Sequence, residues 1–207
     1  MILSSNSHPL RYQALERKLW GMSLLIAPAI TIVGTLFWQQ GEAGIIGGTC
    51  IILATIFWIP AFIGLFSLLR DEMPVYALLG LMIAIYGCIG GNNFGFEAYY
   101  REIFSISGEQ KRQAFSAYPL AFNFVLFWPG PLFPLSLLVL SINYLRKKSV
   151  PLWVAVMLCM GAVLFPAGRI PKIMWIALTT DFILAIPLLY IGNMLLQKKL
   201  FNHSSSI

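Results

Sequence analysis

One acidic residue, Asp181, lies inside a long apolar run near the carboxyl end of the sequence. Keeping a carboxyl group in hydrocarbon costs free energy, so an acid at that depth is a functional candidate by default. Such a group can carry a proton, bind a cation, or act as a general acid or base in catalysis. The alternative is that Asp181 only forms a hydrogen bond that holds two helices together.

The surroundings of Asp181 in the sequence predict its contacts and its charge. Ala177 and Ala185 lie four residues on either side, which makes a stripe of small residues that should face another helix and not lipid. Because desolvation favours the protonated form, we expect Asp181 to be neutral unless Arg169, Lys172 or a bound cation reaches it.

A second group of polar residues ends another apolar run, in the stretch GGNNFGFEAYYRE. Asn93, Glu97 and Arg101 are four residues apart and share one face of a helix. This spacing predicts that Glu97 and Arg101 pair and face a pocket together. The alternatives are that the two charged residues simply lie at the membrane interface, and that Asn92 and Asn93 only join helices through hydrogen bonds.

A third polar position, Asn123, is followed closely by the proline-rich segment WPGPLFP. A proline removes the helical hydrogen bond to the carbonyl four residues earlier. The carbonyls freed in this way are those of Val125, Phe127 and Gly130. Lipid offers no donor to a freed carbonyl, so we expect a kinked or unwound helix near Gly130 whose carbonyls bind a neighbour, water or a ligand.

The composition predicts the class of protein that positions these residues. The chain has 207 residues, of which 58% are hydrophobic and only 11% are charged, with a mean hydropathy of +0.79. Soluble domains carry about 25% charged residues. We therefore predict an all-α integral membrane protein, with residues 1–207 forming a single domain and a compact bundle of six transmembrane helices. The predicted spans are residues 20–38, 44–69, 75–96, 118–144, 150–167 and 171–196.

The fourteen basic residues predict the orientation in the membrane. Nine lie on the side of the two chain ends: Arg11, Arg17, Lys18, Arg70, Arg146, Lys147, Lys148, Lys198 and Lys199. Five lie on the other side: Arg101, Lys111, Arg112, Arg169 and Lys172. Because basic residues are enriched on the cytoplasmic side, we predict a multi-pass protein of the cell membrane with both termini in the cytoplasm.

Several classes of function are disfavoured by the residues that the spans lack. Histidine occurs only at positions 8 and 203, and the three cysteines, Cys50, Cys88 and Cys159, are far apart in apolar runs. We therefore expect no metal site and no cofactor. The basic residues flank apolar runs as topology signals do, so we expect no nucleic-acid partner.

Three functions remain open. The first is an outward-facing polar pocket that binds or translocates a small or amphipathic molecule, in a proton-linked manner if Asp181 carries the proton. The second is a metal-free enzyme of the isomerase or cyclase type, in which Asp181 and Glu97 act as acid and base on an apolar lipid or isoprenoid. The third is a non-catalytic partner that helps to assemble a membrane complex.

The expected surroundings and site follow from the first of these functions. The expected partners are the lipid bilayer, an unidentified small molecule or lipid, and a second copy or another membrane protein. The residues predicted to line the ligand site are Asn92, Asn93, Glu97, Arg101, Asn123, Arg169 and Asp181.

Overall fold

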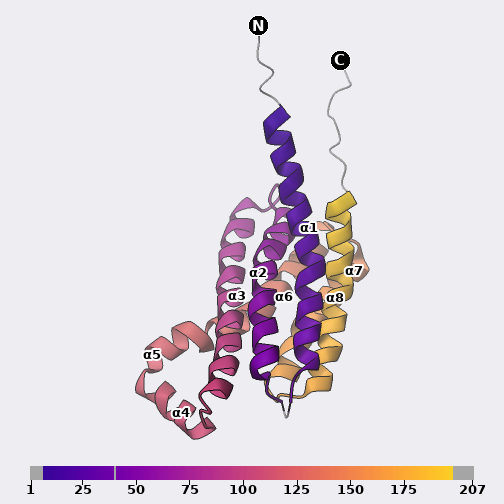
Figure 1. Cartoon of the computed structure of the whole chain (residues 1–207). Helices are drawn as coiled ribbons and strands as arrows, with labels where there is room; N and C mark the ends of the chain where they lie inside the picture. Colours follow the sequence, from indigo (N-terminus) through magenta and orange to yellow (C-terminus); the bar gives the residue numbers. More distant parts are fainter. Residues whose placement is uncertain (1–6, 40, 198–207) are drawn as a thin grey trace, which may run out of the picture.

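A computed structural model describes residues 7–39 and 41–197, and these residues form helices joined by short turns, without a strand among them (Figure 1). The helices are α1 (Ser7–Leu36), α2 (Gly44–Ser67), α3 (Pro74–Ile103), α4 (Gly108–Ala117), α5 (Pro119–Phe122), the π-helical segment η1 (Asn123–Phe127), α6 (Pro129–Lys147), α7 (Leu152–Arg169) and α8 (Met174–Gln197). Six stretches are long and apolar enough to cross a membrane: residues 11–36, 44–67, 74–103, 119–147, 152–169 and 174–197. The predicted all-α bundle of six spans is confirmed, and the chain is a multi-pass membrane protein.

The six long helices form a closed ring. Each of α1, α2, α3, α6, α7 and α8 contacts the next in this order, and α8 returns to α1. Large side chains fill the interior, where Phe133 packs edge-on against Trp58 and Phe62 with ring centroids 4.9 and 5.5 Å apart. Helices of alternating direction place the start of α1 and the end of α8 at one end of the bundle (Figure 1).

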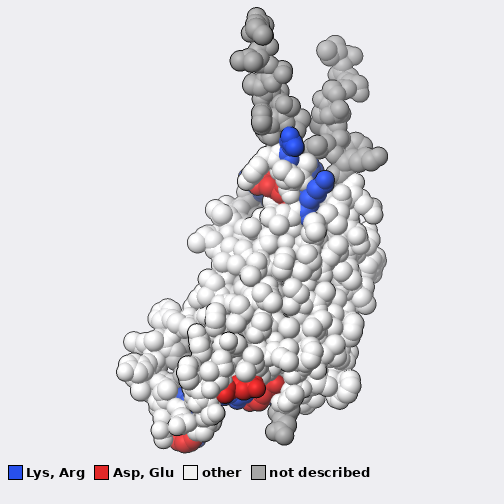
Figure 2. Space-filling model, viewed as in Figure 1, with Lys and Arg blue, Asp and Glu red and all other residues white. Residues whose placement is uncertain are grey.

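The opposite end carries a short projection, which we call the arm and which comprises α4 and α5, residues 108–122 (Figure 1). The α1–α2 turn and the α7–α8 turn lie at this same end, which we call the arm end. In Figure 2 the charged residues gather at both ends of the visible face, and the band between them is uncharged. This distribution is what a bilayer requires, because charge is costly in the hydrocarbon region.

The third span is longer than the sequence predicted. It continues as one helix to Ile103, whereas the apolar pattern ends at residue 96. No proline interrupts the polar stretch, and Gly95 faces the α2 backbone so closely that an added Cβ would lie 2.9 Å from the Gly48 carbonyl oxygen. Glu97 and Arg101 therefore belong to a continuous helix that extends past the apolar layer towards the arm end.

The fourth span is broken, as its prolines predict. The break lies slightly before Gly130: residues 123–127 form a π-helical turn, and α6 begins at Pro129. The Trp128 amide donates to the Asn123 carbonyl at 2.8 Å, which is the five-residue spacing of a π-helix. A neighbour satisfies one of the freed carbonyls, because the Asn93 side-chain amide donates to Val125 at 2.8 Å.

Candidate functional site

The most deeply buried charged group of the described residues is Asp181, which is 3% exposed. Its Oδ1 accepts a hydrogen bond from Arg169 Nη2 at 2.6 Å, and its Oδ2 accepts one from Thr35 Oγ1 at 2.7 Å. The three residues come from three helices, α8, α7 and α1. Thr35 Oγ1 also lies 3.1 Å from the Thr31 carbonyl oxygen, so its single hydrogen is shared between two acceptors.

The hairpin of α7 and α8 brings Arg169 and Asp181 together. Arg169 is the last residue of α7, and Asp181 lies two turns into α8. The two helices touch at Gly168, where an added Cβ would lie 2.4 Å from the Ala177 amide nitrogen. Ala177 is fully buried and Ala185 is 6% exposed, so the predicted stripe of small residues does face other helices. Close approach of the helix backbones lets the long arginine side chain reach the acid.

The sequence predicts a neutral Asp181 only if no cation reaches it. In the structure Arg169 does reach it. Lys172, the other predicted cation, instead pairs with Glu42. An isolated acid in hydrocarbon would keep its proton, but a guanidinium in contact favours the charged form. Arg169 and Asp181 therefore form a buried ion pair, which we call the polar centre.

The guanidinium of Arg169 has a second set of contacts. Its central carbon lies 3.7 Å from the centroid of the Phe165 ring, one turn earlier on α7, which is a cation–π contact. Its Nη1 atom is buried and finds no hydrogen-bond acceptor within the described part of the chain. An unpaired buried donor is unfavourable, so this nitrogen is available to an acceptor that reaches it.

A small cavity of about 10 Å³ adjoins the carboxylate. Its lining residues are Pro28, Thr31, Trp58, Phe165, Asp181 and Leu184. Trp58 Nε1 donates to Thr31 Oγ1 at 3.1 Å across this region, which fixes both side chains. The cavity has room for about one water molecule and for nothing larger.

A second polar group, the Glu42 cluster, joins the turns at the arm end. Glu42 Oε2 lies 2.8 Å from Arg101 Nη2 of α3, and Oε1 pairs with Lys172 of the α7–α8 turn. Paired backbone hydrogen bonds of 2.9 Å between Gln39 and Glu42 hold the acid in a tight turn. Burial alone would raise the pKa of Glu42, but the hydrogen bonds and charges of Arg101 and Lys172 outweigh it and lower the pKa below its ordinary value of 4.5.

The pairing of Glu97 with Arg101 that the sequence predicted is wrong. Arg101 binds Glu42, and Glu97 instead pairs with Lys111 of α4, with 2.7 Å between Oε1 and Nζ. Four-residue spacing permits an ion pair along a helix but does not exclude partners from other elements. Glu42 was not predicted as a partner of Arg101, although an acid beside Gly41 in a short turn was a usable signal.

The seven residues predicted to line the ligand site thus fall into separate groups. Arg169 and Asp181 meet, Arg101 joins the Glu42 cluster, and Glu97 holds the arm. Asn93 binds the broken fourth span. For Asn92 and Asn123 we find no side-chain hydrogen bond among residues 7–39 and 41–197.

Six apolar helices around a buried ion pair define a multi-pass membrane protein with a polar centre inside its bundle. No family model matches the chain, and neither a curated protein nor a solved structure matches it.

Proposed function

We propose that this membrane protein binds a small or amphipathic molecule with an anionic group at Arg169, and that it carries this molecule across the membrane together with a proton held by Asp181. The observation that supports this most directly is the state of Arg169. One nitrogen of its guanidinium, Nη2, donates to the carboxylate of Asp181, and the other terminal nitrogen, Nη1, is buried and bound by no described residue. A planar guanidinium with free donors suits a carboxylate or phosphate, which it can bind in a bidentate manner.

Proton and ligand would be linked through competition for this arginine. While Asp181 is ionised, it occupies Arg169 at 2.6 Å. When Asp181 takes up a proton, the attraction weakens and the guanidinium is free to bind an anion in its place. Proton binding then favours ligand binding, and by linkage the ligand favours proton uptake to the same extent.

The described form would be the closed state of such a cycle. Its cavity of about 10 Å³ is far smaller than the 300–1,000 Å³ or so of a typical ligand pocket. The Glu42 cluster ties the α1–α2 turn to α3 and to the α7–α8 turn at the arm end. Lys172 follows Arg169 by three residues, and Glu42 follows Thr35 by seven. Access from the arm end would require these ion pairs to separate.

A binding assay on purified protein tests the proposal. Thermal stability in lipid nanodiscs is measured with acetate, benzoate or octanoate, and with the corresponding neutral amides, at about pH 5 and about pH 7.5. The expected result is stabilisation by at least one carboxylate and not by its amide, with a larger effect at the lower pH. Stabilisation by acid and amide alike, or by neither, would count against an anion site.

Matched variants separate the site from the rest of the surface. Arg169→Gln should lose the carboxylate effect, whereas Arg146→Gln, an exposed arginine at the opposite end of the bundle, should retain it. Asp181→Asn should keep anion binding and lose its pH dependence, because the amide resembles the protonated acid. An unchanged pH dependence in this variant would remove Asp181 from the proton-linked step.

The other two functions have weaker support. An acid–base enzyme needs Glu97 and Asp181 on one substrate, but Glu97 is held by Lys111 of α4 and Asp181 by Arg169 of α7. An assembly role, including self-association, stays a prediction, because apolar outer helix faces are expected of any protein in lipid.

A further inference from the structure

The arm contains an open groove of about 420 Å³. Its lining residues are Gly108, Lys111, Arg112, Phe115, Ser116, Pro119 and Phe122. Phe115 of α4 stacks on Phe122 of α5 with ring centroids 4.1 Å apart, and this pair closes the bend between the two helices. The volume lies in the range of ligand-binding pockets.

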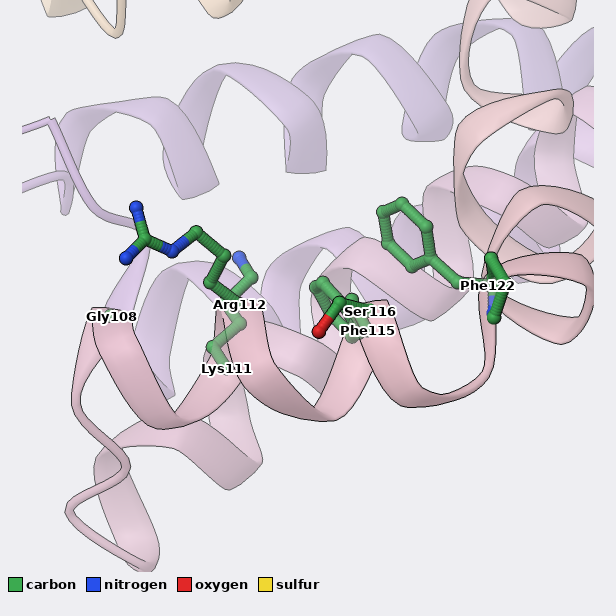
Figure 3. Close-up of a pocket in the computed structure, with 7 residues that line it drawn as sticks. Gly108, Lys111, Arg112, Phe115, Ser116 and Phe122 are labelled. Carbon is green, nitrogen blue, oxygen red and sulfur yellow. The ribbon is translucent and has the colours of Figure 1, made fainter.

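The groove has a basic end and an apolar end. Figure 3 shows Lys111 and Arg112 towards Gly108, and Phe115 and Phe122 towards α5. Both charged residues of the lining are basic. Each is ion-paired with one acid outside the lining: Lys111 Nζ lies 2.7 Å from Glu97 Oε1, and Arg112 Nη2 lies 2.5 Å from Glu109 Oε2. An anion in the groove would share these two cations with the carboxylates, next to an apolar wall.

The surroundings of the arm are those of a membrane interface. The arm follows the end of α3 and leads through η1 into α6, so it lies where two spans leave the apolar layer (Figure 1). Aromatic and aliphatic side chains remain exposed beside it, with Tyr118 at 72%, Leu120 at 70% and Trp128 at 45%. Tyrosine and tryptophan are enriched at this depth of a bilayer, where phosphate groups and the first acyl carbons are found.

We propose that the groove binds one anionic phospholipid of the surrounding membrane. An acyl chain would lie against Phe115, Pro119 and Phe122, and the phosphate would bind Lys111 and Arg112. The charge of the lining selects an anionic headgroup, and the apolar wall selects a lipid over a free phosphate. This site is separate from the Arg169–Asp181 centre and does not depend on the function proposed for it.

Native mass spectrometry of the purified, delipidated protein tests this lipid site. Phosphatidylglycerol and phosphatidylcholine with identical acyl chains are added separately, and glycerol 3-phosphate serves as the headgroup without a chain. We expect one tightly bound phosphatidylglycerol and about tenfold weaker retention of phosphatidylcholine, because two basic residues contact the anionic headgroup. Equal retention of the two lipids would overturn the proposal, and so would displacement of the lipid by glycerol 3-phosphate, which would indicate a site for free anions.

A matched pair of double variants locates the bound lipid. Lys111→Gln with Arg112→Gln should abolish the preference for phosphatidylglycerol. Lys147→Gln with Lys148→Gln removes two adjacent basic residues at the opposite end and should preserve the preference. If both double variants behave alike while retaining the thermal stability of the wild type, the lipid is not held at the arm.

Phe115→Ser should weaken retention of both lipids, and unchanged retention would exclude the acyl chain from the groove.

Discussion

The side-chain amide of Asn93 donates to the carbonyl of Val125 at 2.8 Å, and Val125 is the residue whose carbonyl Pro129 leaves without its helical partner. Nearby, the Tyr86 hydroxyl donates to the carbonyl of Phe124 at 2.5 Å. Two side chains of α3 therefore donate hydrogen bonds to two backbone carbonyls of the broken fourth span. The close contact of Gly90 with Pro129, where an added Cβ would lie 2.7 Å from the proline Cβ, lets the two segments approach.

We expect Asn93→Leu to lower the free energy of unfolding by about 0.6–2 kcal/mol, the value of a polar contact between membrane helices. Asn92→Leu is the matched control, because its neighbouring amide has no such partner among the described residues, and it should cost less. Unfolding of both variants in detergent micelles measures the difference. Equal losses would mean that the Val125 carbonyl finds another donor.

Breaking the Arg169–Asp181 pair from one side should destabilise the protein. Asp181→Asn leaves a guanidinium without its counter-charge, and removing one partner of a buried pair costs about 3–5 kcal/mol. The arginine side chain is 20% exposed, so we expect a loss near the lower limit. Asp181→Asn combined with Arg169→Gln should recover much of the stability, as measured by thermal unfolding. A double variant no more stable than the single one would contradict this account.

The Glu42 cluster should make stability depend on pH in the acid range. The folded pKa of Glu42 is lowered below 4.5, so its stabilisation is present above that value and is lost as the pH falls through the folded pKa. Glu42→Gln should therefore lower the melting temperature at about pH 6 and change it little at about pH 3. Glu109→Gln, which removes an exposed ion pair within α4, serves as the control and should have a smaller effect at both pH values.

Labelling of single introduced cysteines tests the predicted orientation in the membrane. With both termini in the cytoplasm, the arm end faces outwards. In a background without native cysteines, Gln39→Cys at the arm end should react with an impermeant maleimide in intact cells, and Lys148→Cys at the other end should not. The reverse pattern would invert the topology. Lys198 and Lys199, which contribute to the predicted orientation, lie outside the described residues.

The sequence by itself determined the number of spans, their approximate positions and the break in the fourth. An apolar run of about 20 residues can satisfy its backbone in lipid only as a helix, and three prolines within six residues cannot keep a regular helical ladder. It also placed Asp181 on a face that meets other helices, because small residues recur at helical spacing on both sides of it. These features depend on the local chain and on its solvent, and both can be judged from residue types alone.

Only the tertiary structure decided which polar groups meet. Glu97 and Arg101 are one turn apart, yet each pairs with a residue from another element, Lys111 and Glu42. Long charged side chains have several partners within reach, and the choice depends on how turns far apart in the sequence come together at the arm end. Hydrogen bonds and ion pairs between elements follow from packing, which local spacing does not encode.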